Sequence, residues 1–149
     1  MNQEKKLEKL NQKLKKIYYR KRKELLFHGW HHINFVRKKS RIFAQSINAN
    51  VFIVESAAFV HDLNYLVKAN SLPEDGKELR QEILSKCGYS EEEITKIESI
   101  IKEEHTATRD ENISPEAKAL SDADTLFKAL PFTPILFSRN FFLTSTSLA

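Results

Sequence analysis

The chain has 149 residues, including 24 Lys or Arg, 20 Asp or Glu, three Gly, four Pro and one Cys. One cysteine excludes an intramolecular disulfide and a Cys-rich zinc module, and so few Gly and Pro argue against a hairpin-rich β fold. Because there is no run of about 18 uncharged apolar residues and no apolar stretch behind the N-terminus, we expect no membrane-spanning helix, no secretory signal and a cytoplasmic location.

The formal net charge of +4 is distributed unevenly along the chain. Residues 1–41 contain 14 Lys or Arg against 3 Asp or Glu, whereas residues 42–149 contain 10 against 17. This distribution predicts a mildly acidic domain behind a basic leader, and it does not favour a uniformly basic nucleic-acid-binding body.

Residues 3–24 are predicted to form one basic amphipathic helix, because apolar residues recur at spacings of three and four between Lys and Gln. The apolar positions are Leu7, Leu10, Leu14 and Ile17. The basic face could bind a phosphate backbone, anionic lipid or a partner helix, or it could be the solvated surface of a helix that covers the core. We favour the solvated surface, because no base-reading pattern accompanies the basic residues.

The remainder of the chain predicts further helices separated by short turns. These are residues 25–47, 51–67 and 77–87, a helix beginning at Glu91 after the capping box of Ser90 and Glu93, and residues 115–130 after Ser114. An apolar segment at residues 133–143 belongs to the core or to an interface, which leaves a homo-oligomer open. The predicted fold class is all-α, a single helical bundle, with residues 1–24 as a leader helix and residues 25–149 as the domain.

Several polar residues lie in segments that are otherwise apolar. His28 and His32 are four residues apart, so they project from one face of a helix. His61 and Asp62 lie within the most apolar segment of the chain, where a carboxylate without a partner would be too costly to bury. His105 continues an isoleucine stripe, so we expect it to point inward.

Asp122 and Asp124 lie within a predicted helix, although Asp is a poor helix former. One explanation covers all of these residues, because helical bundles build metal sites from imidazole and carboxylate groups that meet in the core. Histidine and aspartate without thiolate suit Mn, Fe, Zn, Mg or a similar divalent ion. Such an ion polarises a phosphoryl oxygen and lowers the pKa of a bound water molecule, which then attacks phosphorus.

The order of four motifs resembles the HD-domain metal-dependent phosphohydrolases, over about residues 25–130. The segment HGWHHINFV is similar to the first ligand helix of that family, and SAAFVHDL is similar to the segment that gives the family its name. The segments IIKEEH and DADTL are similar to its later histidine and aspartate elements. The four segments begin at His28, Ser56, Ile100 and Asp122.

The resemblance implies that the metal ligands are His32, His61, Asp62 and Asp124. It also implies catalytic roles for Asp62, which would hold the attacking water, and for His28 and His105, which would bind phosphate, support the ligands or hold a second metal. The expected activity is hydrolysis of a small phosphorylated molecule, with a nucleotide as the favoured substrate. Candidates to stabilise the phosphoryl charge are Arg37, Lys68 and Lys128.

The chain departs from the family pattern at a few positions. Gly29 stands where relatives often have Asp, Asn64 stands where a small residue is frequent, and Asn34 and Phe35 stand where an Arg is common. The family usually continues beyond the last ligand, so the resemblance makes this chain, which ends at Ala149, an abbreviated member.

These departures keep an alternative open, namely a metal- or nucleotide-binding regulatory module that releases no phosphate. A third reading, a nucleic-acid-associated protein, predicts salt-dependent binding that deletion of residues 1–24 abolishes. The favoured partner is a small-molecule phosphoester, and neither a membrane nor a nucleic acid is expected to bind.

Overall fold

The computed structural model describes residues 1–105 and 112–130. Within these ranges the chain forms α-helices and one short 3-10 helix, with no strand, which confirms the expected all-α fold. The elements are α1 (Gln3–Arg20), α2 (Trp30–Ser46), α3 (Val51–Val60), α4 (Asn64–Val67), η1 (Pro73–Gly76), α5 (Lys77–Lys86), α6 (Glu91–Glu104) and α7 (Pro115–Ala129). The apolar segment at residues 133–143 lies outside the described residues.

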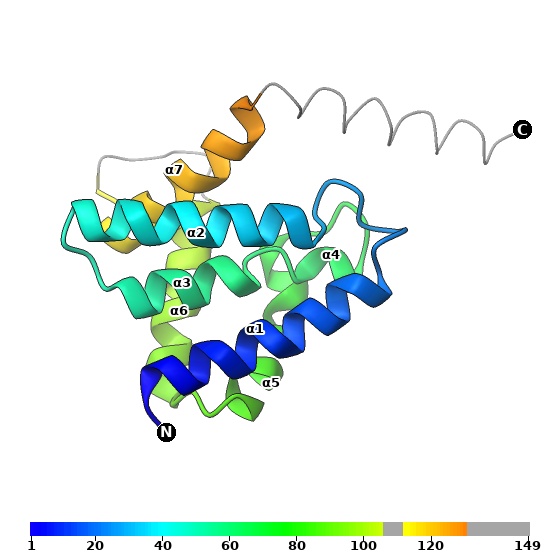
Figure 1. The fold of residues 1–149 in the computed structure, drawn as a ribbon, viewed down its shortest axis with the longest axis horizontal. Helices are drawn as coiled ribbons and strands as arrows, with labels where there is room; N and C mark the ends of the chain where they lie inside the picture. The colour runs from blue at the N-terminus through cyan, green and yellow to red at the C-terminus, as the bar shows by residue number, and fades with distance from the viewer. Residues whose placement is uncertain (106–111, 131–149) are drawn as a thin grey trace, which may run out of the picture.

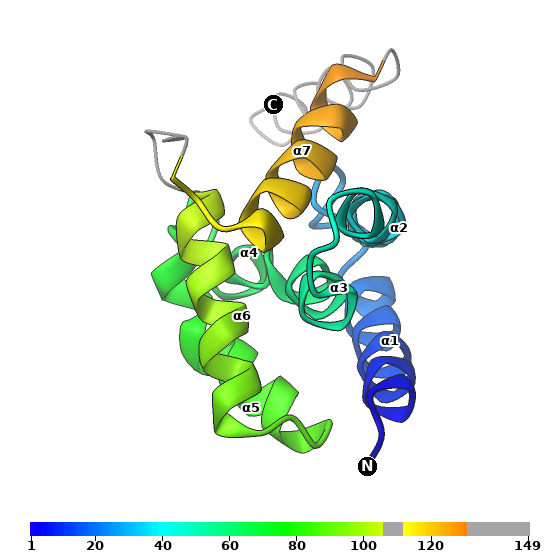
Figure 2. The same ribbon diagram turned by 90° about the vertical axis from the view of Figure 1, so that its left-hand side faces the viewer.

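Helix α3 lies at the centre of the bundle and packs against α1, α2, α6 and α7 (Figures 1 and 2). Every residue from Phe52 to Val60 is buried. A helix that is apolar on nearly all sides is stable in water only when other helices surround it, which explains its central position. Helices α2 and α3 run side by side in opposite directions, and α7 packs on both of them (Figure 1).

Helix α1 covers one side of α3 with the leucine stripe that its sequence predicts. Leu10, Leu14 and Tyr18 are buried in the same hydrophobic core as residues of α3, α5 and α6. At its N-terminal end, Lys6 Nζ lies 2.7 Å from a carboxylate oxygen of Glu93 in α6. The interpretation of α1 as a helix that covers the core is therefore confirmed.

Three of the predicted helices are shorter than the sequence suggests, and the first of them, expected over residues 3–24, ends at Arg20. The helix expected over residues 25–47 begins only at Trp30, with Gly29 as N-cap. The helix expected over residues 51–67 ends at Val60, where Leu63 N donates to the carbonyl oxygen of Val60, three residues back, and tightens the chain into a turn before α4. The histidine and aspartate that follow Val60 therefore lie at a break in the buried segment, and not inside a continuous helix.

The predicted helix starts are confirmed by their caps. Ser90 and Glu93 form the reciprocal capping box of α6, and the Ser114 side chain accepts a hydrogen bond from Ala117 N at the start of α7. Asn50 caps α3 in the same way by accepting from Ile53 N. Among the helices of the described ranges, none has the length and apolar character needed to cross a bilayer.

Candidate metal centre

The four residues expected to be metal ligands meet in the interior, although they come from three parts of the chain. His32 lies in the first turn of α2, His61 and Asp62 follow α3, and Asp124 lies on the inner face of α7. All four side chains are buried, with exposed fractions between 1% and 9%. The close packing of α2 and α7 on α3 brings them together.

The nitrogen and oxygen atoms of this cluster face one another. His32 Nε2 lies 3.3 Å from His61 Nε2, 3.0 Å from Asp62 Oδ2 and 3.3 Å from Asp124 Oδ1. His61 Nε2 lies 3.4 Å from Asp62 Oδ1 and 3.9 Å from Asp124 Oδ1. Atoms that share a metal ion at about 2.0–2.2 Å lie about 3 Å apart around it, so these separations fit one divalent ion.

The second nitrogen of each imidazole bears on whether the residues fit a metal ion. His61 Nδ1 lies 2.8 Å from the carbonyl oxygen of Ala58, to which it donates, and this bond leaves the Nε2 lone pair facing the cluster. Metal-bound histidines are commonly oriented by a bond of this kind. His32 Nδ1 is buried without a hydrogen-bond partner in the described structure. His32 is therefore held by its Nε2 contacts and by packing against the rings of Phe27 and Phe127.

His28 lies at the edge of the cluster, before the first turn of α2. Its Nδ1 atom is 2.8 Å from Asp62 Oδ2, and its ring stacks on Tyr65 with ring centroids 3.8 Å apart. The side chain is 28% exposed, more than any of the four expected ligands. Nitrogen and oxygen atoms of His28, His32 and Asp62 lie within 4.8 Å of one another, so His28 is placed either to orient Asp62 or to bind an ion with it.

The charges of the cluster depend on one another. Burial would lower the pKa of His61, but the carboxylates of Asp62 and Asp124 outweigh burial and raise that pKa to about 10. The pKa of His32 is also raised, since bonds to the same two carboxylates overcome its burial. Burial opposes ionisation of the carboxylates, yet the imidazoles hold the pKa values of Asp62 and Asp124 below their usual range. Without a metal ion, His61 therefore retains its proton at neutral pH, and a divalent ion can replace it.

The expected phosphate-binding cations have different environments. Lys128 is placed at the cluster, because its Nζ atom pairs with Asp124 Oδ2 one turn away in α7. Arg37 lies instead beside Arg41, and both guanidinium groups bond to the buried carboxylate of Glu55. Lys68 is exposed just after α4. Arg37 is thus engaged in holding α2 against α3, and Lys128 is the candidate that the geometry favours.

The expectation that His105 points inward is wrong. The buried positions of α6 continue from Ile97 and Ile101 to Glu104, which is three residues beyond Ile101, and the helix ends there. His105 forms the C-cap and is exposed. Glu104 is a buried carboxylate that the sequence analysis missed, and its pKa is raised by burial and by the nearby Asp124 and Asp62. The three-residue step from Ile101 was the signal that could have identified it.

Other polar residues of the motifs have structural explanations or point outward. Asp122 and His31 are exposed, although each lies one or two residues from an expected ligand. A Cβ atom on Gly29 would lie 2.6 Å from the carbonyl oxygen of Leu25, so no larger residue fits there without movement. Asn64 is buried and donates to the carbonyl and hydroxyl oxygens of Ser71, which holds the loop after α4.

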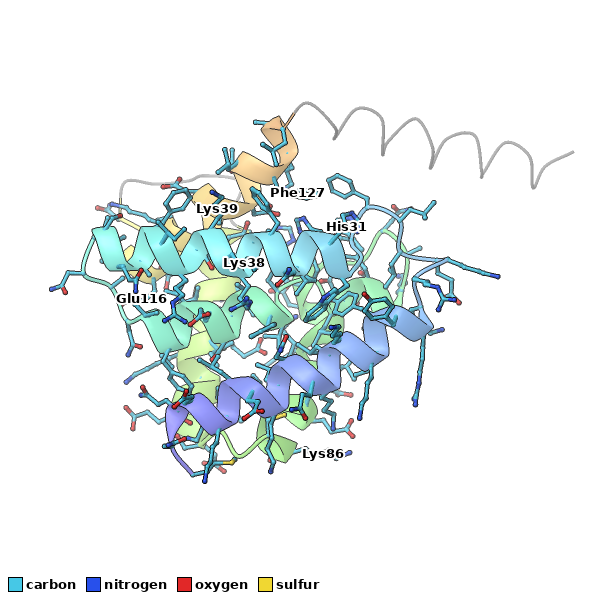
Figure 3. All side chains as sticks on the ribbon, viewed as in Figure 1. His31, Lys38, Lys39, Lys86, Glu116 and Phe127 are labelled. Carbon is cyan, nitrogen blue, oxygen red and sulfur yellow. The ribbon has the colours of Figure 1, made fainter. Side chains whose placement is uncertain are left out.

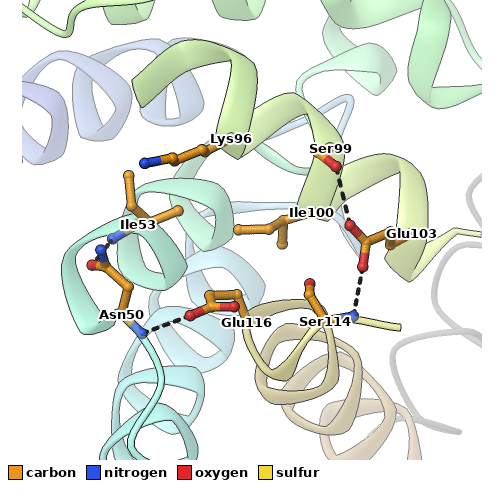
Figure 4. A pocket seen from close by; sticks show the side chains of 8 residues that line it. All are labelled: Asn50, Ile53, Lys96, Ser99, Ile100, Glu103, Ser114 and Glu116. Atoms are coloured by element: carbon orange, nitrogen blue, oxygen red, sulfur yellow. Dashed lines mark hydrogen bonds between the residues drawn. The ribbon is translucent and has the colours of Figure 1, made fainter. Parts of the chain in front are cut away.

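A cavity of about 310 Å³ between α3, α6 and α7 lies apart from the cluster (Figure 4). Its two carboxylates already bond to the backbone, because Glu116 accepts from Asn50 N and Glu103 accepts from Ser114 N. These bonds satisfy amide groups at the starts of α3 and α7. The cavity is therefore lined by groups that connect helices, and none of its lining residues belongs to the cluster.

Comparisons with known proteins connect the chain to one set of relatives. No family model matches the sequence. An uncharacterized protein of Bacillus subtilis, YpgQ, is 30% identical over 103 residues, which cover 66% of this chain and 50% of YpgQ. The chain thus spans about half the length of the curated relative it matches.

Solved structures of Bacillus subtilis YpgQ have a similar fold. The structure of YpgQ in complex with ADP superposes with a TM-score of 0.68, at 25% identity, over 99% of this chain and 69% of YpgQ. A second YpgQ structure gives a TM-score of 0.62 at 24% identity, covering 95% and 68% of the two chains. The helical arrangement that brings the cluster together is therefore one that a nucleotide-bound relative also has.

Proposed function

We propose that this chain is a divalent-metal-dependent phosphohydrolase of the HD-domain type. The observation that carries the proposal is the convergence of His32, His61, Asp62 and Asp124, whose nitrogen and oxygen atoms lie 3.0–3.9 Å apart in the interior. Two carboxylates and two imidazoles that face one another in the interior are a donor set that suits a divalent ion in a helical bundle. Their order in the sequence is the one that the resemblance to HD-domain enzymes implies.

The chemistry of the residues suits phosphoester hydrolysis. When bound, a divalent ion such as Mn, Fe, Mg or Zn supplies a positive charge that polarises a phosphoryl oxygen and favours ionisation of water. Asp62 offers one oxygen to His32 and another to His61, and it also contacts His28. Asp62 and His28 are therefore placed to orient the attacking water and to accept its proton.

The cation that we assign to the phosphoryl group is Lys128. Its ammonium group pairs with Asp124 at the cluster, and its pKa is raised because the carboxylates of Asp124, Glu104 and Asp62 outweigh its burial. An ammonium group beside the ligands can stabilise the negative charge that develops on the phosphoryl oxygens. His105 is exposed at the end of α6, so we give it no role in this step.

A nucleotide is the substrate class that we favour. Support comes from the YpgQ structure with bound ADP, since that protein is 25% identical to this chain and has a similar fold. A nucleoside di- or triphosphate offers a phosphoanhydride bond, and a monophosphate offers a phosphoester bond. Both are cleaved by attack of water at phosphorus, so the same ligand set serves either reaction.

A regulatory module that binds metal or nucleotide without turnover is the alternative. Two of the sequence features that favoured it were Gly29 and Asn64, and both have structural explanations in the close approach to Leu25 and the bonds to Ser71. The two readings differ in one measurable respect, because only the enzyme releases phosphate or pyrophosphate from the nucleotide that it binds.

The test begins with metal content, measured by mass spectrometry on protein purified without chelator. We expect about one or more equivalents of a transition metal in the parent and a loss of this metal in the double variant His61→Ala/Asp62→Ala. The variant His31→Ala/Asp122→Ala is the matched control, because it removes an exposed His and an exposed Asp near the same ligands. Parent protein that takes up no Mn, Fe, Zn or Mg would overturn the proposal.

Turnover is then measured as phosphate and pyrophosphate release from nucleoside mono-, di- and triphosphates, with Mn or Mg added. Release by the parent and the control, but not by His61→Ala/Asp62→Ala, is the expected result. Metal and nucleotide binding without release would establish the regulatory module in place of the enzyme.

A further inference from the structure

A groove of about 410 Å³ lies between α1 and the end of α5, and its polar lining is almost entirely cationic. The cations are Lys9, Lys13, Lys16, Arg20 and Lys86. Ile17 and the buried Cys87 are the apolar residues of its lining, and no carboxylate is among the residues that line it. None of these residues belongs to the metal cluster.

The four cations on α1 form one continuous stripe. Positions 9, 13, 16 and 20 are spaced by four, three and four residues, so they lie on one face of a helix with 3.6 residues per turn. In the part of the chain that the structure describes, none of the four forms an ion pair. Lys86, the cation of the groove that does not lie on α1, pairs with Glu82 of α5.

The positive field of the stripe reaches the inside of the groove. Burial raises the pKa of the Cys87 thiol, and Lys13 and Lys9 act in the opposite direction because their charges favour the thiolate. Lys13 also helps Lys86 to lower the pKa of Glu82. Converging like charges in a concave site focus the potential there, which a convex solvated surface does not do.

The stripe is held rigidly against the body of the protein. The opposite face of α1 contributes the buried Leu10, Leu14 and Tyr18 to the core, and Lys6 anchors its first turns to Glu93. Lys86 approaches from a different helix, at the lower end of the molecule in Figure 3. A fixed set of cations loses less freedom on binding a ligand than a mobile basic tail would.

We infer that this groove binds the phosphate backbone of a single nucleic-acid strand, independently of its sequence. The stripe from Lys9 to Arg20 covers eleven residue steps of helix, or about 16 Å at 1.5 Å per step. A strand carries one phosphate per about 3.4 Å in a duplex, so the stripe spans several consecutive phosphates. The groove is lined by no aromatic ring, which favours contact with phosphates over stacking on bases.

Two other anionic partners fit the groove less well. The phosphates of a single nucleotide would occupy only part of a stripe that spans three turns of α1. A membrane surface is flat and is usually bound with apolar anchors beside the cations, whereas the apolar residues of the groove, Ile17 and Cys87, are half-buried or buried. A polyanionic strand can enter the groove and engage its cations along their full length.

Deletion of residues 1–24 is not a suitable test of this site, although the sequence suggests it. The deletion would expose core residues that pack against Leu10, Leu14 and Tyr18, and the protein would lose stability for reasons unrelated to binding. Substitution of Lys9, Lys13 and Lys16, which are exposed or half-buried, by Gln avoids this problem, because Gln preserves the helix and removes the charge.

The experiment compares two triple variants with the same change in net charge. The groove variant is Lys9→Gln/Lys13→Gln/Lys16→Gln. The control is Lys38→Gln/Lys102→Gln/Lys118→Gln, three exposed lysines on α2, α6 and α7 that lie outside the groove and, within the described residues, form no ion pair. The probe is a fluorescein-labelled oligothymidylate of about 15 nucleotides without a terminal phosphate, followed by fluorescence anisotropy at increasing KCl.

We expect the parent to bind with a log–log salt slope of about −3, since four cations each contribute about −0.7 on a single strand. The groove variant should bind at least about tenfold more weakly at about 50 mM KCl, with a slope nearer −1, while the control stays within about twofold of the parent. Absence of binding at low salt, or equal weakening in both variants, would overturn the inference.

Two competitors identify the occupant. Displacement of the probe by unlabelled oligothymidylate, but not by inorganic tripolyphosphate at equal phosphate concentration, is the expected result. Equal displacement by tripolyphosphate would make a small polyphosphate the ligand and overturn the assignment to a strand. Vesicles of phosphatidylserine and phosphatidylcholine that bind through the same lysines more strongly than the oligomer would overturn it in favour of a membrane surface.

Discussion

Buried charge serves different ends in two regions of this molecule. Around α5 and α6, Arg80 donates two hydrogen bonds to the carboxylate of Glu98, at 2.8 and 2.6 Å, and a third to the carbonyl oxygen of Pro73. Between α2 and α3, Glu55 accepts from both Arg37 and Arg41. In each case a guanidinium group, which is always charged, meets a carboxylate, although Arg37 Nε is buried without a hydrogen-bond partner among the described residues.

In the cluster between α2, α3 and α7, the carboxylates of Asp62 and Asp124 meet imidazoles, which are cationic only when protonated, and Lys128 pairs with Asp124 at one edge. Two imidazole nitrogens, of His32 and His61, lie 3.3 Å apart, and the carboxylates of Asp62 and Asp124 approach the same nitrogens. His32 Nδ1 has no hydrogen-bond partner among the described residues. The comparison teaches that the first arrangement connects helices through charges that are always present, whereas the charge of the second depends on protons that a divalent ion can replace.

The largest expected effect is the loss of activity in Asp124→Asn. The substitution keeps the shape of the side chain but removes the charge of an expected ligand that lies 3.3 Å from His32 Nε2. We expect loss of bound metal and a fall in the phosphate-release rate of about a thousandfold or more, because metal stabilisation of a phosphoryl group is worth several kcal/mol. Metal content and initial rates measure this, and circular dichroism checks that the fold is kept.

Asp122→Asn is the matched control for that variant. It makes the same chemical change in α7 at an exposed position two residues away, so metal content and rate should equal those of the parent. If Asp122→Asn lost as much activity as Asp124→Asn, the cluster would not be the centre of the reaction.

The second prediction concerns the ion pairs that hold helices. Arg80→Met should lower the free energy of unfolding by about 3–5 kcal/mol, because it leaves the largely buried Glu98 carboxylate without its cation. Chemical denaturation measures the change, with the exposed pair of Lys86 and Glu82 as comparison, since Glu82→Gln should leave the unfolding midpoint unchanged. The metal content of Arg80→Met per folded molecule should remain that of the parent. If this variant lost metal but kept its stability, Arg80 would serve the cluster and not the connection between helices.

A smaller effect is expected at His28, which contacts the cluster from its edge. His28→Phe keeps a ring to stack on Tyr65 but removes the nitrogen that lies 2.8 Å from Asp62. Groups that orient a metal ligand typically contribute about 10–100-fold, so we expect a rate loss of this size with the metal retained. Complete loss of metal in this variant would make His28 a ligand, and an unchanged rate would remove it from the site.

The sequence predicted which polar residues meet in the interior better than it predicted the helices that carry them. Polar residues within apolar segments could be identified from the sequence, because a single buried polar group is costly. In the structure, His32, His61, Asp62 and Asp124 do converge. The break after Val60 was not predicted, because the apolar pattern continues through residues 61–67 while the backbone bonds change to a three-residue spacing. A tight turn inside an apolar run leaves little trace in periodicity.

The sequence also misjudged which residue of α6 faces the cluster. His105 was favoured because histidine is a common ligand and four residues separate it from Ile101, but a helical stripe continues equally through a step of three. In the structure the buried stripe continues from Ile101 to Glu104, three residues further on, and His105 is exposed. Only the packing of α6 against α3 and α7 decides between the two steps.

The smallest expected effect that separates the two regions is the release of protons when a metal ion binds. The carboxylates of Asp62 and Asp124 raise the pKa of His61 to about 10 in spite of its burial, so this imidazole is protonated in the metal-free protein at pH 7.5. Metal binding requires the neutral imidazole, and we therefore expect release of about one proton per ion. Titration calorimetry in two buffers of different ionisation enthalpy measures this number.

The sign of the pH dependence follows from the same raised pKa. Protonated His61 stabilises the metal-free fold below pH 6.5, and this contribution is lost as the pH rises toward 10. Metal affinity should change in the opposite direction, rising about tenfold per pH unit for each proton released. His31→Ala, which removes an exposed imidazole, should release the same number of protons as the parent. Metal binding without proton release would mean that the two carboxylates do not hold a proton on His61. Both imidazoles of the cluster would then already be neutral in the metal-free protein.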